Sequence, residues 1–215
     1  MAQHYFDSDP GAASRPTTVN LVLDDLHLRL ATDRGIFSPD RVDPGTRILL
    51  ETVPPPPTHG HLLDLGCGYG PIALTMATRS PAAAVVGVDV NRRALDLAVF
   101  NAQYNHLYNV DFFQVTDDGA PHPHTSPAHP TALSGPFAAI WSNPPIRIGK
   151  DRLHTLLRTW LTRLSPEGTA HLVVHRHLGA DSLQRWLDTH HLPSQRIASR
   201  SGYRVLRITS APAAG

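Results

Sequence analysis

A strand pattern, a glycine-rich turn and a helix pattern follow one another between residues 61 and 79. The apolar run 61–65 is followed by Gly66, Gly68 and Gly70 at every second position. Glycines after a buried strand let the backbone approach a ligand closely, and the following helix directs its first N–H groups to the same place. This pattern predicts a cofactor loop. Its G-x-G-x-G spacing differs from the G-x-G-x-x-G of a dinucleotide site.

Strand and helix patterns alternate from residue 61 to the C-terminus. Apolar runs such as 84–88 indicate parallel strands buried on both faces, and the helices between them make βαβ units. Ser201-Gly202 predicts a hairpin that brings one antiparallel strand into the sheet. The expected fold is α/β, with a doubly wound, mostly parallel seven-stranded sheet and a C-terminal antiparallel hairpin. The expected strands are 61–65, 84–90, 109–115, 137–142, 169–174, 195–200 and 203–209, and the expected helices are 70–79, 91–105, 150–164 and 180–190.

The residues before this pattern predict an N-terminal extension. Residues 19–32 alternate apolar and polar side chains around Asp24-Asp25, as in a β-hairpin. Asp43 followed by Pro44 predicts a capped helix to about residue 52, and prolines 54–57 end it. We therefore expect one globular unit, with 1–57 packed on a catalytic domain of 58–215. Residues 117–136, rich in Pro, His, Thr and Ser, predict a surface insertion.

Composition limits the kinds of partner and compartment. The chain has 215 residues, a formal charge of +1 and a pI near 8.1, so any contact with RNA requires a local basic patch. The single cysteine fits a reducing compartment. No apolar run is long enough to span a bilayer, and no secretory signal is apparent, so a cytoplasmic protein is expected. His122, His124 and His129 lack neighbouring ligands, so no metal is expected. The oligomeric state stays open.

Acidic residues at strand ends complete the expected cofactor site. Asp89 ends the second strand, where a carboxylate can accept both ribose hydroxyls, although it could instead cap the next helix. Asp117, or its neighbour Asp118, could accept the adenine amino group. Cys67 is interpreted as a small residue between glycines, because no local base would activate it. The expected cofactor-binding residues are Asp64, Gly66, Cys67, Gly68, Gly70, Asp89, Val90, Asp117 and Asn143.

A polar turn after the strand 137–142 predicts the acceptor site. Two acceptors, the Asn143 side-chain oxygen and the Pro144 carbonyl, are suited to the two N–H bonds of a planar amine. Pro144 and Pro145 fix φ and remove competing N–H donors, so the turn keeps its shape. Asn143, Pro144, Pro145 and Ile146 are therefore the expected catalytic residues. Arg147 and Lys150, the only lysine, could contact phosphates.

These motifs resemble class I S-adenosylmethionine-dependent methyltransferases. Further segments make the chain similar to the small-domain superfamily that includes small-subunit ribosomal RNA guanine-N2 methyltransferases: 32–38, 43–46, 143–150, 175–179 and 202–206. The resemblance implies a methyl donor, S-adenosylmethionine, bound by Gly66, Gly68 and Asp89. It also implies a target amine, guanine N2 of ribosomal RNA or of the small ribosomal subunit, received by Asn143 and Pro144. Phe37 and Thr46 would close the pocket.

Two departures from that family leave alternatives open. Ile146 stands where many nitrogen methyltransferases carry Phe or Tyr to stack on a flipped base, so Phe37 or Tyr5 would have to supply a ring. The chain also has one catalytic copy where related guanine-N2 enzymes have a doubled domain. Three alternatives are therefore kept: a methyltransferase acting on a protein glutamine amide, a non-catalytic RNA-binding or ribosome-assembly module, and a nicotinamide oxidoreductase.

Overall fold

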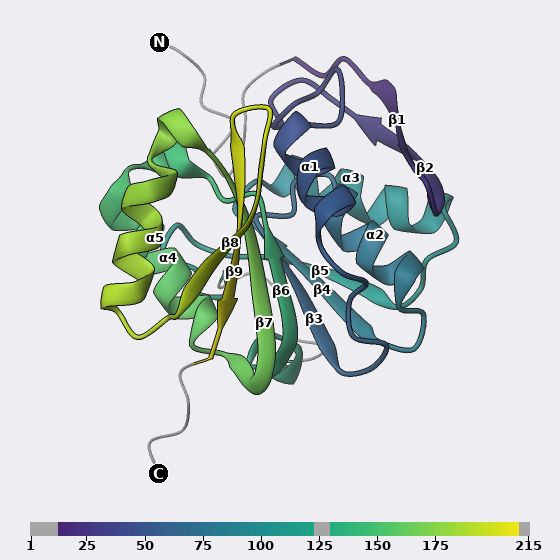
Figure 1. The fold of residues 1–215 in the computed structure, drawn as a ribbon. Coiled ribbons are helices and arrows are strands. Elements are labelled where there is room, and N and C mark those ends of the chain that lie inside the picture. Colours follow the sequence, from purple (N-terminus) through teal and green to yellow (C-terminus); the bar gives the residue numbers. More distant parts are fainter. Residues whose placement is uncertain (1–12, 123–129, 211–215) are drawn as a thin grey trace.

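The structure is a computed structural model that describes residues 13–122 and 130–210. A seven-stranded sheet forms its centre, in the order β5-β4-β3-β6-β7-β9-β8 (Figure 1). Neighbouring strands are parallel from β5 to β7, and β9 is antiparallel to both β7 and β8. The strands of this sheet are β3 (His61–Leu65), β4 (Ala84–Asp89), β5 (Val110–Gln114), β6 (Phe137–Ser142), β7 (Leu164–His175), β8 (Ser194–Arg200) and β9 (Tyr203–Thr209).

Helices cover both faces of the sheet (Figure 1). The helices are α1 (Pro44–Thr52), α2 (Pro71–Arg79), α3 (Arg92–Tyr104), α4 (Lys150–Leu161) and α5 (Ala180–Thr189), with short 3₁₀ turns η1 (Pro130–Leu133), η2 (Ile146–Ile148) and η3 (Arg176–Leu178). One buried cluster joins α1, α2 and α3 to sheet residues such as Leu62, and another joins α4 and α5 to residues such as Leu63. Successive strand residues therefore face opposite layers, which confirms the doubly wound sheet.

The structure corrects two expected boundaries, the end of helix α4 and the start of strand β7. Helix α4 was expected to reach residue 164 but ends at Leu161, because Leu164 already pairs with Phe137 in the sheet. Strand β7 consequently starts at Leu164 instead of at 169, with an irregular register between Phe137 and Ala139. The remaining expected elements lie within a few residues of their observed positions.

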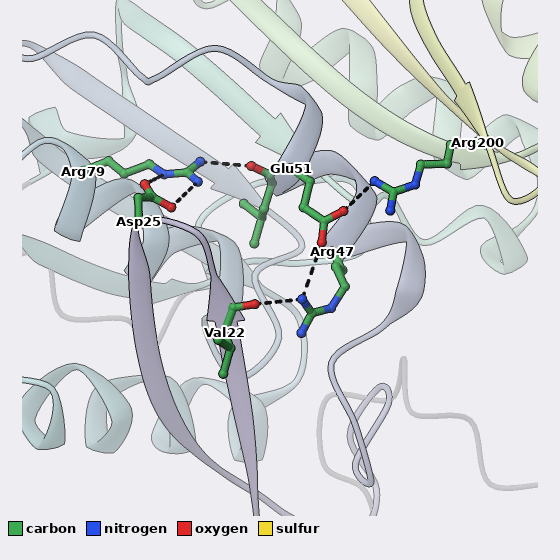
Figure 2. A network of polar contacts seen from close by, with 7 residues as sticks. Val22, Asp25, Arg47, Glu51, Arg79 and Arg200 are labelled. Atoms are coloured by element: carbon green, nitrogen blue, oxygen red, sulfur yellow. Dashed lines mark hydrogen bonds and ion pairs between the residues drawn. The ribbon is translucent and has the colours of Figure 1, made fainter.

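The N-terminal part forms a separate two-stranded ribbon, β1 (Thr17–Leu23) and β2 (Leu26–Thr32), followed by α1. Asp43 caps α1, as expected, by accepting a 3.0 Å hydrogen bond from the Thr46 amide. Ion pairs tie the ribbon and α1 to the core (Figure 2): Arg79 of α2 bonds Asp25, and Arg200 of β8 bonds Glu51. The hairpin and helix are confirmed, whereas the division at residue 57 stays a prediction.

The topology brings the two predicted functional turns together. Strands β3 and β6 are parallel neighbours at the centre of the sheet, with Asp64 opposite Trp141. The glycine loop and the Asn143 turn follow these strands at the same sheet edge, where ligands bind in open α/β sheets. Ser142 Oγ joins the two strand ends by donating a 2.6 Å hydrogen bond to the Leu65 carbonyl. None of the described helices is long and apolar enough to cross a membrane.

Candidate active site

A cavity of about 480 Å³ opens at the carboxyl edge of the sheet, over the ends of β3, β4, β6 and β7. Its size is within the range of small-molecule and cofactor pockets. One end is formed by the glycine loop and the end of β4, and the other by the Asn143 turn and the start of α1. The predicted residues that line it are Phe37, Thr46, Gly66, Cys67, Gly68, Asp89, Val90, Asn143, Pro144, Pro145, Ile146 and Arg147.

The glycine loop forms an open cradle at the first end. Gly66 has φ +76° and Gly68 has φ +54°, a region that strongly favours glycine. A Cβ at Gly68 would meet nothing within 4 Å, so this part of the loop borders free space. A Cβ at Gly66 would lie 3.8 Å from Pro145 Cδ, which places the two turns side by side. The backbone can therefore approach a bound molecule closely.

Asp89 braces this loop from the end of β4. Its carboxylate accepts hydrogen bonds from the Gly68 amide at 2.8 Å and from the Asn91 amide at 2.9 Å. Burial raises the pKa of Asp89. The hydrogen bonds that its carboxylate accepts from three backbone N–H groups counteract that rise. The helix-cap alternative for Asp89 is wrong, because the Asn91 side chain caps α3 through the Ala94 amide. Asp89 therefore braces the glycine loop from the cavity wall, where its carboxylate could also accept hydrogen bonds from a ribose.

Two of the predicted cofactor residues lie behind the cavity wall. Asp64 is fully buried, and its Oδ2 accepts a 2.8 Å hydrogen bond from the Ala73 amide in α2. Burial raises the pKa of Asp64 well above its usual value, and the nearby Asp89 charge adds to this. Gly70, with φ +97°, is the N-cap of α2. Both residues position the loop instead of lining the cavity.

Cys67 lines the cavity but is 3% exposed, and burial raises the pKa of its thiol well above the usual value. The negative charges of Asp89 and Asp64 raise that pKa further. A thiol with a raised pKa is a poor nucleophile, because the thiolate is the reactive form. The interpretation of Cys67 as a small residue in a tight loop fits this environment.

The Asn143 side chain is held in one orientation at the other end of the cavity. Its Nδ2 donates to Asp43 Oδ1 at 2.8 Å and to Thr46 Oγ1 at 3.1 Å. A carboxylate oxygen can only accept, so the amide nitrogen must face Asp43 and the amide oxygen must face elsewhere. No described residue hydrogen-bonds that oxygen. Asn143 lines the cavity, so its amide oxygen is a candidate acceptor there, and the catalytic role expected from the sequence stays a prediction.

The two prolines form a tight turn beside it. Pro145 has φ −75° and ψ 70°, the geometry of an inverse γ-turn, and the Ile146 amide donates to the Pro144 carbonyl at 2.8 Å. This bond uses one of the two lone pairs of the Pro144 carbonyl and leaves the other for a ligand. Ile146 lines the cavity and also packs against the α4 layer of the core. The turn is thus fixed from both sides.

Several wall residues were not assigned to the site from sequence. Asp43 had been assigned only a helix cap, and Tyr69 and Tyr203 had no role, yet all three line the cavity. The Tyr69 hydroxyl is buried without a described partner, and burial and the Asp43 charge raise its pKa. His175 and His177 also line the cavity, and the His175 ring packs edge-on against Tyr203 at 4.8 Å. Two sequence signals pointed toward them: their position at the end of a strand and their place in the segment 175–179 of the family resemblance.

The remaining predicted residues lie elsewhere. Asp117 is exposed and pairs with Arg152 at 3.2 Å, because a turn in which the Thr116 amide bonds the Ala120 carbonyl carries it away from the cavity. Lys150 starts α4 at the surface, outside the cavity lining. Arg147 lines the cavity and is otherwise exposed. No group of three potential metal ligands occurs among the described residues. Tyr5, His124 and His129 lie outside the described residues.

Comparisons with known proteins show relatives along nearly the whole chain. The chain is 30% identical over 207 residues to the uncharacterized protein YbxB of Bacillus subtilis, covering 96% of this chain and 98% of that one. It is 32% identical over 183 residues to ribosomal RNA small subunit methyltransferase C of Hahella chejuensis, covering 83% of this chain and 48% of that one.

The fold is shared with solved structures. The 16S rRNA N2 methyltransferase RsmC of T. thermophilus, solved in complex with AdoMet and guanosine, superposes with a TM-score of 0.73 at 24% identity, covering 94% of this chain and 52% of that one. The chain thus spans about half the length of these methyltransferase C relatives. The family model of the methyltransferase small domain matches residues 27–207. The chain belongs to the methyltransferase small domain family, and S-adenosylmethionine is the methyl donor that this membership implies.

Proposed function

We propose that this protein transfers a methyl group from S-adenosylmethionine to an exocyclic amine, guanine N2, of ribosomal RNA in the small ribosomal subunit. The observation that carries the proposal is the fixed orientation of Asn143, whose amide nitrogen is held by Asp43 and Thr46. The amide oxygen that remains is suited to an N–H donor. Relatives named for small-subunit ribosomal RNA methylation support the choice of substrate.

The cofactor end of the cavity fits the proposed methyl donor. Gly66, Cys67 and Gly68 provide a backbone wall without side-chain obstruction, and Asp89 and Val90 line the adjacent strand end. The Asp89 carboxylate, already in the cavity wall, can accept the hydroxyls of a ribose. When bound, S-adenosylmethionine would supply a cationic methyl group for transfer to the nitrogen, with the electron pair of the C–S bond staying on sulfur and one nitrogen proton passing to solvent.

The acceptor end of the cavity would position the amine. The Asn143 oxygen and the free lone pair of the Pro144 carbonyl accept its two N–H bonds, which fixes the nitrogen and favours its pyramidal, nucleophilic form. Pro145 and Ile146 keep this turn rigid through the Ile146–Pro144 bond. The site would accelerate methyl transfer mainly by holding the nitrogen and the methyl group in line and by its fixed electrostatic environment. No strong base is needed, because the nitrogen proton becomes acidic as the methyl transfers.

The RNA would reach the cavity over its exposed rim. Phe37 is 39% exposed and lines the cavity, so its ring borders the space that an extruded base would enter. It would replace the aromatic side chain that Ile146 does not provide. Arg147, beside the acceptor turn, is placed to contact a phosphate.

Radiolabelled methyl transfer tests the proposal. The protein is incubated with labelled S-adenosylmethionine and, separately, with ribosomal RNA, small ribosomal subunits and translation-factor protein. The variants Asn143→Ala and Asn20→Ala are run alongside, since Asn20 is exposed on β1 and lies outside the cavity. We expect label in RNA with the wild type and N20A, but not with N143A. Label in protein would contradict the proposal and favour a methyltransferase that acts on a glutamine amide. No label, despite measurable cofactor binding, would favour a non-catalytic RNA-binding module.

A further inference from the structure

The two oxygens of the Asp43 carboxylate have different surroundings. Oδ1 accepts two hydrogen bonds, from the Thr46 amide at 3.0 Å and from Asn143 Nδ2 at 2.8 Å. Oδ2 receives no hydrogen bond from any residue in the described ranges 13–122 and 130–210. Asp43 also lines the cavity. Two wall residues, Asp43 and Asn143, therefore each keep one oxygen that receives no hydrogen bond within the described part of the chain: Asp43 Oδ2 and the Asn143 amide oxygen.

The position of Asp43 is closely determined by its neighbours. Gly45 allows the Tyr203 ring to approach, because a Cβ there would lie 2.7 Å from Tyr203 Cε1 and 2.9 Å from Asp43 Oδ1. Burial raises the pKa of Tyr203, and the negative charge of Asp43 adds to that rise. The hydrogen bonds from the Thr46 amide and Asn143 Nδ2 to Oδ1 also hold the carboxylate in place. An acceptor held in this way is preorganised for a ligand donor.

The group beside the target nitrogen differs among the candidate substrates. In guanine, the N2 amine is flanked on one side by N1–H, which is a donor, and on the other by N3, which is an acceptor. In adenine and cytosine, the exocyclic amine is flanked by a ring nitrogen that accepts, and in a carboxamide by a carbonyl oxygen that accepts. A carboxylate oxygen attracts the N1–H donor of guanine. It repels the accepting ring nitrogens of adenine and cytosine and the carbonyl oxygen of a carboxamide. Asp43 Oδ2 can therefore distinguish guanine from every alternative acceptor considered above.

We propose that Asp43 Oδ2 accepts the N1–H of guanine while Asn143 accepts from N2, so that Asp43 selects guanine as the substrate base. This inference rests on the proposed function and assigns its substrate specificity to a residue of the N-terminal segment. Asp43 would act on the substrate directly, and through Oδ1 it would also position Asn143.

The variant Asp43→Asn separates these two roles. Its carbonyl oxygen can still accept from Thr46 and Asn143 in the place of Oδ1, whereas its NH₂ group replaces Oδ2 and would face the N1–H donor unfavourably. Asp43→Ser is a second variant, because serine keeps the helix cap but lacks the second oxygen. Asp40→Asn is the matched control, since Asp40 is exposed in the same segment and does not line the cavity.

Labelled methyl transfer to small ribosomal subunits and protein-free ribosomal RNA is measured, and the RNA is digested to nucleosides. We expect wild type and D40N to label guanosine, and D43N and D43S to lose about 10- to 100-fold of this activity, as expected for one base-edge contact. For D43N and D43S, the affinity for S-adenosylmethionine and the unfolding midpoint should equal those of the control D40N. D43N should also increase the ratio of adenosine to guanosine label, because its NH₂ group suits a ring acceptor.

The outcomes distinguish the two proposals. Label in adenosine or cytidine with the wild type would overturn the guanine assignment and leave nitrogen methylation standing. Guanosine label that D43N and D43S reduce by less than about threefold would overturn the role of Asp43 alone, since a lost base contact costs more than that. Label in protein, or no label in RNA, would overturn the proposed function and the selection of guanine with it.

Discussion

Asn143 donates a 2.8 Å hydrogen bond to Asp43, which precedes it by 100 residues. The bond joins the acceptor turn at the end of β6 to the first turn of α1. The N-terminal segment therefore contributes to the candidate active site, because without Asp43 the Asn143 amide could rotate and present its nitrogen to the cavity. Helix α1, which Asp43 caps, packs against β7 and β9.

Thr46 provides the second contact to the Asn143 amide, at 3.1 Å. Replacement by valine keeps the shape and removes the hydroxyl, so we expect methyl transfer to fall about 3- to 10-fold, the worth of one hydrogen bond. The affinity for S-adenosylmethionine should not change. Steady-state kinetics and calorimetry provide the two measurements. Thr46→Ser keeps the hydroxyl and should retain activity; equal loss in both variants would contradict an orienting role for this oxygen.

Asp89 is predicted to set cofactor affinity. Asp89→Ala removes an acceptor for ribose hydroxyls and the brace on Gly68, so the dissociation constant for S-adenosylmethionine should rise about 10-fold or more, as for a charge-assisted bond. Asp96→Asn is the control, because Asp96 is exposed on α3 and pairs only at the surface with Arg92. Calorimetry measures both variants.

The raised pKa of Asp89 adds a pH dependence to cofactor binding. The carboxylate form accepts hydroxyls, so affinity is complete above the pKa of the folded protein and is lost as pH falls through it. Because burial raises that pKa, the loss should begin at a higher pH than for an ordinary aspartate. The same titration with D89N should lack this transition; a transition that persists in D89N would assign it to another group.

His171 is predicted to destabilise the protein in acid. It is 2% exposed in β7, its ring nitrogens have no described partner, and burial and the Arg207 charge lower its pKa to about 4. The unfolded chain takes up a proton near pH 6.5, whereas the folded chain does so only near pH 4. Stability should therefore fall as pH decreases between these values, by up to about 3 kcal/mol.

Denaturant unfolding from pH 7.5 to pH 4.5 measures this effect. His171→Leu removes the titrating group and fills a similar volume, so its unfolding free energy should depend less on pH over that range. Parallel curves for H171L and the wild type would show that other groups cause the acid destabilisation.

The Arg79–Asp25 ion pair of Figure 2 should contribute more to stability than an ion pair between two exposed side chains. Arg79 is 14% exposed, forms two bonds with Asp25 and donates to the Leu50 carbonyl at 3.1 Å. Arg79→Ala should cost about 1–2 kcal/mol, because the Leu50 carbonyl loses a partner. Arg92→Ala, at a surface pair with Asp96 whose side chains are both over 60% exposed, should cost at most about 0.5 kcal/mol. Urea unfolding compares them, and equal costs would contradict a role for Arg79 in holding the ribbon.

The sequence predicted the elements of the fold better than the composition of the site. Strands 61–65 and 137–142 and the cap at Asp43 follow from local patterns, because apolar periodicity and side-chain capping act over a few residues. The glycine loop and the Asn143 turn could also be placed, since parallel strands present their carboxyl ends at one edge.

Residues that reach the site through tertiary packing could not be predicted. Tyr203 and His175 line the cavity because β7 and β9 pair, which no local pattern encodes. The second role of Asp43 depends on a partner 100 residues away. Asp117 was placed by its position after a strand, but a turn between Thr116 and Ala120 directs it outward to Arg152.

The most direct test of the proposed mechanism measures Asn143→Ala in two ways: the dissociation constant for S-adenosylmethionine by calorimetry, and single-turnover methyl transfer to small-subunit RNA. An orienting acceptor predicts unchanged cofactor affinity and a loss of transfer of about 100-fold or more, typical of removing a positioned transition-state contact. Transfer at the wild-type rate in N143A, or a loss explained entirely by weaker cofactor binding, would contradict the role assigned to this residue.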